Sequence, residues 1–187
     1  MEDSEVKGAA MKRVVLFIAM SLDGYIADCE GNVDWLMGQE PQQDDMVSYD
    51  EFIKKISTVV IGWNTYHQII TELSPGKWFY SGLKSYVLTH RRLPSTEEIV
   101  FVDEDVCKLV RDLKEISSKD IWICGGAAVI RPLIEADLID QYYISVIPTI
   151  LGDGIRLFEG KSSEIKLRLV NTKRYNGIVD LVYERRM

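Results

Sequence analysis

Runs of apolar residues alternate with amphipathic segments along most of the chain. Continuous apolar, β-branched runs predict buried strands at 13–20, 58–62, 84–89, 97–102, 120–124 and 139–150. Helical spacing of apolar residues predicts helices at 64–73, with Asn64 or Thr65 near the cap, at 103–117 and at 127–136. The same spacing predicts an earlier helix containing Met46, Tyr49, Phe52, Ile53 and Ile56. Strand–helix alternation with short connections predicts an α/β fold with a largely parallel sheet covered by helices on both faces.

The end of the chain has a different pattern. Residues 165–186 predict two strands joined at Asn176-Gly177, which is the strongest short signal for a β-hairpin. We therefore expect a sheet of about eight strands that closes with an antiparallel pair. The stretches "SLDGYIADCEGNVDW" and "LGDGIRLF" are interpreted as loops. Residues 1–11 are polar and without period, which indicates a flexible tail before a single domain over 12–187.

Composition narrows the class of protein. The chain has 187 residues, is 47% hydrophobic and carries a formal charge of -7, which argues against a nucleic-acid or anionic-membrane partner. The longest early apolar run, "VVLFIAM", is too short to span a bilayer and lacks the flanks of a signal peptide. Cys29, Cys107 and Cys124 form no CxxC pair, which favours reduced thiols in a cytoplasmic protein, with Cys124 in the core. With two histidines, His67 and His90, and no cysteine pair, we expect no metal site.

Candidate chemistry gathers where predicted strands end. Gly62 follows one buried strand, Arg91 and Arg92 follow another, and Gly125-Gly126 follows a third. Helix N-termini offer free N–H groups to phosphate, small residues let phosphate approach the backbone, and arginine forks match phosphate oxygens. Together these pieces suit NADPH. Each alone has an ordinary structural explanation, and neither G-x-G-x-x-G nor G-x-x-x-x-G-K-[ST] is present.

The order of these pieces resembles the dihydrofolate reductase superfamily. It resembles more closely the reductase domain of the riboflavin-biosynthesis deaminase–reductase and that domain's stand-alone relatives. The resemblance spans 13–185 and is carried by "FIAMSLDGYIAD", "STVVIGWNTYHQ", "SYVLTHRR", "IWICGGAAVIRPLIEADLIDQYYISVIPTILGDGIRLF" and the last strand pair. It implies a dihydrofolate-reductase-like three-layer fold, a small-molecule substrate and NADPH as cofactor.

The resemblance also implies roles for individual residues. The Gly125-Gly126 peptide, typically cis in these reductases, faces the cofactor pyrophosphate, and Ala127 opens the following helix. The segment "SLDGYIA" matches a mobile loop over the nicotinamide, and Trp35 matches a tryptophan that lines the active site. The remaining matched positions are Gly62 and Thr65 at a second phosphate junction, Thr89, His90, Arg91 and Arg92 at the adenosine 2′-phosphate, and Ala19 and Ile26 at the nicotinamide.

Two positions depart from the family pattern. The residue after Gly62 is usually a phosphate-binding arginine, but here it is Trp63, which stacks or packs instead. Folate reductases also place one carboxylate in the pocket from the helix after the active-site tryptophan, and no single acid aligns with it here. The alternatives for this acid are Glu40, Asp44, Asp45 and Asp50. The candidates for a catalytic role are therefore Asp50, Asp45 and Trp35.

The sequence thus supports several functions. The leading hypothesis is an NADPH-dependent reductase of a small pterin-like or pyrimidine-like heterocycle, acting as a cytoplasmic homodimer. One alternative is the riboflavin-pathway ribosylaminopyrimidine reductase, and another is a non-catalytic nucleotide-binding protein. Zinc-dependent deamination is excluded, because the chain contains neither H-x-E nor P-C-x-x-C.

Overall fold

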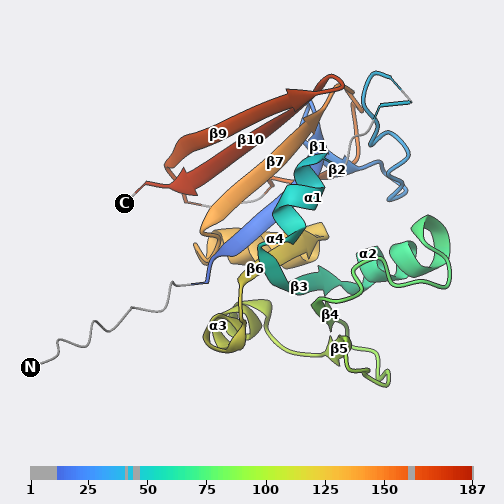
Figure 1. Ribbon diagram of the computed structural model, residues 1–187, viewed down its shortest axis with the longest axis vertical. Helices are drawn as coiled ribbons and strands as arrows, with labels where there is room; N and C mark the ends of the chain where they lie inside the picture. Colours follow the sequence, from blue (N-terminus) through green and yellow to red (C-terminus); the bar gives the residue numbers. More distant parts are fainter. Residues whose placement is uncertain (1–11, 41, 44–46, 160–162, 187) are drawn as a thin grey trace, which may run out of the picture.

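The computed structural model describes residues 12–40, 42–43, 47–159 and 163–186. In this part of the chain one 8-stranded sheet has the order β5-β4-β3-β6-β1-β7-β10-β9 (Figure 1). The neighbouring strands β5, β4, β3, β6, β1 and β7 run parallel to one another. Strand β10 runs antiparallel to β7, and β9 runs antiparallel to β10. These strands are β1 (Val14–Ser21), β3 (Ile56–Gly62), β4 (Lys84–Leu88), β5 (Ile99–Val102), β6 (Asp120–Gly125), β7 (Gln141–Ile147), β9 (Leu167–Tyr175) and β10 (Ile178–Arg185). The predicted sheet of mostly parallel strands with a closing antiparallel pair is confirmed.

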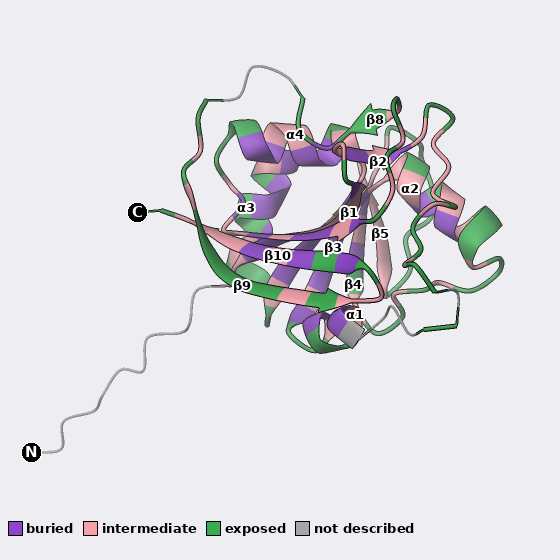
Figure 2. Cartoon of the chain, turned by 90° about the horizontal axis from the view of Figure 1, so that it is seen from above, coloured by how far each residue is buried: buried purple, intermediate pink, exposed green. Residues whose placement is uncertain are grey.

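Helices cover the sheet on both faces (Figure 2). Helices α3 (Val106–Ile116) and α4 (Ala127–Glu135) pack on one face through an aliphatic core. Helices α1 (Val47–Ile53) and α2 (Trp63–Gln68) pack on the other, which is rich in aromatic rings. We call these the aliphatic face and the aromatic face. The arrangement is the expected three-layer fold.

Local sequence explains the elements that match the prediction. Helix α3 begins after Asp105, whose carboxylate accepts a hydrogen bond from the Lys108 backbone N–H at 2.8 Å. Four of its apolar residues fall three or four apart and are buried against the sheet. In the β9–β10 turn, Asn176 and Gly177 both have positive φ, at 44° and 76°, as a two-residue hairpin turn requires.

Two predicted helices need correction. Helix α1 ends at Ile53, and Ile56 begins β3. The position of Ile56 continues the helical spacing of apolar residues, which is why the pattern predicts it in the helix, but it belongs to the strand. The helix predicted over 64–73 is α2 followed by a π-helical segment, η1 (Ile69–Leu73). Its N-cap is Gly62 without a side-chain cap bond, so neither Asn64 nor Thr65 caps it. The extended backbone of Gly62 at the end of β3 leads directly into the helix.

Two short strands lie in segments that were predicted as loops. Strands β2 (Tyr25–Ala27) and β8 (Ile155–Arg156) pair antiparallel in a separate sheet. Strands this short carry too few residues for a visible alternation, so their pairing is set by the surrounding fold. The predicted tail, residues 1–11, lies outside the described residues. No helix in the described ranges is long and apolar enough to cross a membrane.

Candidate functional site

Three of the predicted site segments meet at one edge of the sheet. Gly62 of β3 pairs with Leu88 of β4, and Ile61 of β3 pairs with Gly125 of β6. The carboxyl ends of these neighbouring parallel strands therefore lie side by side, followed by α2, by the Thr89 segment and by α4. Ligands of open α/β sheets bind at such an edge.

The two glycine junctions at this edge are packed against each other. A Cβ placed on Gly62 would lie 3.1 Å from Val129 Cγ2 and 3.6 Å from the Gly126 nitrogen. A Cβ on Gly126 would lie 3.3 Å from Thr65 Oγ1. The Gly125-Gly126 peptide is cis, as the resemblance implies, and Gly125 has a φ of 131°, which side chains rarely adopt. The glycines therefore let the two junctions pack closely, with the Val129 and Thr65 side chains in the places where a Cβ would go.

Helix α4 supplies hydrogen-bond donors at the same place. It begins at Ala127, and its N-cap, Gly126, makes no side-chain cap bond. The first backbone N–H groups of a helix lack intrahelical acceptors and carry a positive partial charge. Bare backbone together with such donors fits a pyrophosphate, so Gly125, Gly126 and Ala127 could hold that part of NADPH.

Trp63 and Arg91 form a stacked pair beside the glycine junctions. The Arg91 guanidinium lies over the Trp63 ring, 4.8 Å from the ring centroid. The Trp63 ring also contacts Tyr66, with centroids 5.7 Å apart. A positive charge from the loop after β4 therefore lies over the ring of the residue that follows Gly62. The stack shows how a tryptophan and an arginine share this edge of the sheet.

In the loop after β4, His90, Arg91 and Arg92 are exposed, and Thr89 is half-buried. His90 Nδ1 lies 2.6 Å from Asp103 Oδ1, and the Arg91 backbone N–H donates to Thr89 Oγ1 at 3.1 Å. Arg92 is fully on the surface side of the loop. The exposed guanidinium groups of Arg91 and Arg92 suit the phosphate on a ribose.

The two residues expected at the nicotinamide lie on β1 and β2. Ala19 in β1 and Ile26 in β2 are both half-buried. The "SLDGYIA" segment is fastened by Asp23, which accepts hydrogen bonds from Ser21 Oγ at 2.6 Å and from the Gly152 N–H at 2.8 Å. The Ser21 hydroxyl is the main reason why the pKa of Asp23 falls to about 2. The segment expected to be mobile is thus hydrogen-bonded to the loop after β7.

The structure does not bring a described acid of the 40–50 region into the sheet edge. Asp50 on α1 and Glu40 are exposed, and the Glu40 backbone N–H donates to Asn176 Oδ1 at 2.7 Å. Asp44 and Asp45 lie outside the described residues. Trp35 is half-buried, and its buried indole N–H meets no hydrogen-bond partner among the described residues.

Aromatic rings dominate the sheet face next to this edge. Phe17 stacks on Phe52 with centroids 4.3 Å apart and meets Tyr143 edge-on at 4.6 Å. Tyr80 meets Trp122 edge-on at 4.7 Å, and its hydroxyl lies 3.5 Å from Cys124 Sγ. Burial raises the pKa of Cys124 to about 12. Cys124 packs against the core of the aromatic face, as predicted, but its side chain is half-buried and not buried.

Sequence reasoning missed a polar cluster on the same face. Asp180 in β10 is completely buried and accepts hydrogen bonds from Ser145 Oγ at 2.7 Å, Tyr143 at 3.1 Å and Tyr175 at 3.2 Å. The alternation of β10 could have revealed it, because Ile178, Asp180 and Val182 share the buried positions. An acid on the inward side of a strand is a signal for a satisfied polar site.

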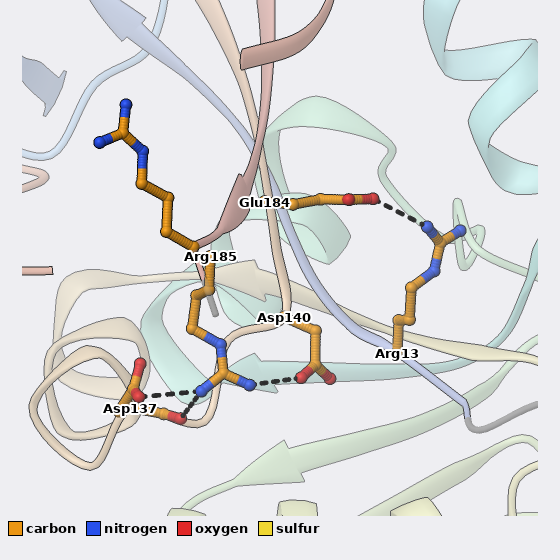
Figure 3. A pocket seen from close by; sticks show the side chains of 6 residues that line it. Arg13, Asp137, Asp140, Glu184 and Arg185 are labelled. Carbon is orange, nitrogen blue, oxygen red and sulfur yellow. Dashed lines mark hydrogen bonds and ion pairs between the residues drawn. The ribbon is translucent and has the colours of Figure 1, made fainter. Parts of the chain in front are cut away.

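A charged pocket of about 480 Å³ lies at the opposite edge of the sheet (Figure 3). Its charges are paired: Arg185 binds Asp137 and Asp140 at 2.9 and 2.8 Å, and Arg13 approaches Glu184 at 3.5 Å. These ion pairs fasten the start of β1 to the end of β10. Because it is far from the glycine junctions and its acids are paired with its arginines, we assign this pocket a structural role.

Comparisons with known proteins extend this picture. Residues 12–179 match the model of the RibD C-terminal domain. The uncharacterized protein YwjB of Bacillus subtilis is 36% identical over 179 residues, which cover 93% of this chain and 98% of YwjB. The riboflavin biosynthesis protein RibD of Haemophilus influenzae is 24% identical over 184 residues, which cover 78% of this chain and 50% of RibD.

A solved structure shows the same architecture. The crystal structure of a protein from Shewanella sp. PV-4, assigned provisionally to riboflavin biosynthesis, matches with a TM-score of 0.80 and 25% identity, covering 94% of this chain and 99% of that chain. The family match and the structural match both extend over nearly the whole described chain. This chain therefore belongs to the RibD C-terminal domain family, a reductase-like domain with the dihydrofolate-reductase-like fold.

Proposed function

We propose that the protein is an NADPH-dependent reductase that reduces a small planar heterocycle, pterin-like or pyrimidine-like. The observation that carries the proposal is the meeting of two bare glycine junctions, where a Cβ on Gly62 would come within 3.6 Å of the Gly126 nitrogen. Such a backbone surface beside the N-terminus of α4 suits a pyrophosphate. Membership of the RibD C-terminal domain family supports the reductase role.

The chain's own residues supply position and charge. The backbone N–H groups of Ala127 and Ala128 bind the pyrophosphate, while Gly125 and Gly126 allow close approach; the next two N–H groups, of Val129 and Ile130, are donated to the Gly126 carbonyl. Arg91, held over Trp63, binds the 2′-phosphate together with Arg92. When bound, NADPH supplies the hydride. Ala19, a small and half-buried residue, leaves room on the sheet for the nicotinamide ring that donates it.

A second candidate is the riboflavin-pathway ribosylaminopyrimidine reductase, which the match to the RibD C-terminal domain favours. Its substrate carries a phosphate and therefore needs cationic groups on the substrate side. A third candidate, a nucleotide-binding protein without catalysis, is favoured by Trp63 in place of the phosphate-binding arginine. Turnover assays separate the three candidates. Turnover of unphosphorylated heterocycles supports the first, turnover of a ribosylaminopyrimidine phosphate supports the second, and turnover of neither supports the third.

The deciding experiment is a titration of the protein with NADPH. Cofactor fluorescence reports binding, and the affinity is calculated for the folded fraction of the protein. We expect Gly126→Val to abolish binding, because its Cβ already lies 3.3 Å from Thr65 Oγ1 and its methyl groups would fill the space between the junctions. The control is Ile123→Val in the same strand, which should bind normally and lose about 0.5–1.5 kcal/mol of stability. Normal NADPH affinity in folded Gly126→Val contradicts the assignment.

We also propose a cytoplasmic homodimer, because two-fold dimers are the most frequent oligomers. Sedimentation at high micromolar concentration tests this, and a clean monomer contradicts it.

A further inference from the structure

The turn between β9 and β10 holds a second segment of the chain as well as closing the hairpin. The Asn176 side chain accepts a hydrogen bond from the Glu40 backbone N–H at 2.7 Å and donates one to the Glu40 carbonyl at 3.0 Å. The Asn176 carbonyl also accepts a hydrogen bond from the Gln39 N–H at 2.9 Å. Asn176 therefore pairs with the backbone of two consecutive residues, much as a neighbouring strand would.

The turn and this segment also fit closely against each other. A Cβ on Gly38 would collide with the Asn176 side-chain amide and lie 2.5 Å from the Asn176 carbonyl oxygen. A Cβ on Gly177 would collide with the Gln39 side chain. A larger residue at either position would push the two segments apart, so the glycines on both sides allow the contact to form.

A second contact holds the other end of the same segment. The side chain of Gln68, the last residue of α2, donates a hydrogen bond to the Gly31 carbonyl at 3.0 Å. Between the two contacts the backbone makes a turn of its own, in which the Met37 N–H donates to the Trp35 carbonyl at 2.8 Å. We call residues 31–40 the strap. The strap is held at one end by helix α2 and at the other end by the hairpin turn (Figure 1).

The sheet topology places the strap at the ligand edge. Helix α2 follows β3, the hairpin turn precedes β10, and β6, β1 and β7 lie between these two strands. Because β10 runs antiparallel to β7, the start of β10 lies at the same edge as the carboxyl ends of the parallel strands. From β3 to β10 there are four strand spacings. These amount to about 19 Å, which ten residues can span. The strap therefore extends along the edge at which the Gly125-Gly126 peptide lies.

The middle of the strap carries Trp35. Its indole N–H is buried and meets no hydrogen-bond partner in the part of the chain that the structure describes. Leaving such a donor unpaired costs roughly 1–3 kcal/mol, so its place suits a polar group bound at the edge. The strap also follows shortly after Ile26, which the family resemblance places at the nicotinamide. The nicotinamide half of NADPH is thus the half expected to lie nearest to the strap.

We propose that Asn176 and Gln68 are positioning residues that hold the strap over the nicotinamide half of the cofactor site. This inference rests on the proposed function, because NADPH is the ligand that the strap encloses. Neither side chain contacts the cofactor, since each acts through the backbone of the strap. A strap that is fixed before binding has less freedom to lose when the cofactor arrives, which favours affinity.

The test compares NADPH with adenosine 2′,5′-bisphosphate, which keeps the adenosine and its 2′-phosphate but lacks the nicotinamide. Asn176→Gly retains a residue that readily adopts the positive φ of the turn and removes the side-chain amide. Titration calorimetry should show NADPH affinity about tenfold lower, in keeping with two lost hydrogen bonds, and affinity for the bisphosphate within about twofold of wild type.

Two further variants grade the effect. Asn176→Asp keeps the acceptor for the Glu40 N–H but loses the donor to the Glu40 carbonyl, so NADPH affinity should fall less than in Asn176→Gly. Gln68→Met keeps the length of the side chain and removes the hydrogen bond to Gly31. This change should lower NADPH affinity about threefold and leave the bisphosphate unaffected.

Amide hydrogen exchange measures the position of the strap without a ligand. The Glu40 N–H donates to Asn176 in wild type, so in Asn176→Gly it should exchange at least about tenfold faster. The matched control is Asn171→Ala in β9, where the asparagine side chain accepts a hydrogen bond from the Thr172 N–H at 2.9 Å. The control should change neither the exchange of Glu40 nor the affinity for NADPH.

Several results overturn this inference and leave the proposed function standing. An unchanged exchange rate in Asn176→Gly means that the turn does not hold the strap. Faster exchange with unchanged NADPH affinity means that the position of the strap has no bearing on the cofactor. Equal losses for NADPH and the bisphosphate mean that the variant disturbs the whole site. If Asn176→Gly does not fold, Asn176→Asp decides by the same criteria. Absence of NADPH binding in wild type contradicts the proposed function and this inference together.

Discussion

The two faces of the sheet are built from different side chains. On the aliphatic face, residues such as Leu16, Ile123 and Leu133 are completely buried, and Tyr142 is the one aromatic ring among the buried members of that cluster. On the aromatic face, the buried rings of Phe52, Tyr66 and Trp122 are joined by many half-buried rings. One face is sealed by two helices, and the other keeps aromatic and polar groups near the surface.

The different side chains of the two faces suit different roles, one in the stability of the fold and the other in ligand recognition. Aliphatic side chains pack densely and bring no polar atoms that need partners. Aromatic rings offer flat surfaces and polar tips, and these tips converge here on Asp180 and Cys124. We therefore assign the aliphatic face to the scaffold and the aromatic face to the ligand. The predictions below test this division, beginning with the largest effect.

Leu133→Ala should cause the largest loss of stability. Leu133 is 0% exposed between α4 and the sheet, and such truncations cost about 2–5 kcal/mol. NADPH affinity per folded molecule should be unchanged. Urea unfolding and cofactor titration measure the two quantities. The counterpart is Phe79→Ala on the aromatic face, where the side chain is 50% exposed, which should change stability little but weaken heterocycle binding. Similar stability losses in both variants contradict the division.

Replacing Arg91 and Arg92 together by alanine should weaken NADPH but not NADH. A hydrogen bond to a charged group contributes about 1.5–3 kcal/mol, so we expect NADPH affinity to fall about 10- to 150-fold. NADH lacks the 2′-phosphate and should lose little. Fluorescence titration with both cofactors measures the effect, and Arg174→Ala on exposed β9 is the control. Equal losses for NADPH and NADH assign these arginines another role.

Alkaline pH should lower the free energy of unfolding through buried groups of the aromatic face. Burial raises the pKa of Cys124 from 9.0 to about 12 and that of Tyr49 from 10.0 to about 12. The folded state holds these protons more tightly, so their stabilising effect is complete below about pH 9 and is lost as pH rises toward 12. Urea unfolding at several pH values should show a falling free energy, and Cys124→Ala should flatten the slope.

The aliphatic face provides the comparison for this effect. Burial also raises the pKa of Tyr142 to about 12, so Tyr142→Phe should flatten the slope by a smaller amount than Cys124→Ala, whose thiol begins from a lower pKa. Identical slopes for wild type and Cys124→Ala contradict a raised pKa of this thiol in the folded state.

The sequence predicts those features that depend on neighbours along the chain. Apolar runs locate the buried strands, and Asn176-Gly177 locates the hairpin because its backbone conformation is local. Gly62 and Gly125-Gly126 are visible as glycines at strand ends, and the parallel order then brings them together. These predictions rest on periodicity and on the conformational needs of glycine.

Features that depend on strand register could not be predicted in this way. The row of Ala19, Ser145 and Asp180 crosses three strands that are far apart in the sequence. The stack of Arg91 on Trp63 joins the ends of two strands, and no spacing along the chain reveals it. Sequence proximity to Trp35 led to acids that are exposed where the structure describes them, whereas Asp180, which is completely buried, lies in β10.

The smallest expected effect concerns the stack of Arg91 on Trp63. Trp63→Leu keeps an apolar side chain but removes the ring under the guanidinium, which lies 4.8 Å from the ring centroid. Exposed cation–π contacts contribute about 0.5–1 kcal/mol, so NADPH affinity should fall about 2- to 5-fold. NADH affinity should stay the same, because the stack positions a group that only the 2′-phosphate uses. Trp63→Phe, which retains a ring, should lose less.

A double-mutant cycle decides whether Trp63 acts through Arg91. In an Arg91→Ala background, Trp63→Leu should have no further effect on NADPH affinity, since the guanidinium that the ring positions is absent. Additive losses, or an equal loss for NADH, mean that Trp63 contacts the cofactor itself or only packs α2 against Phe101. The tryptophan would then belong with the packing residues of the aromatic face, and Arg92 would be the main phosphate-binding group of the β4 loop.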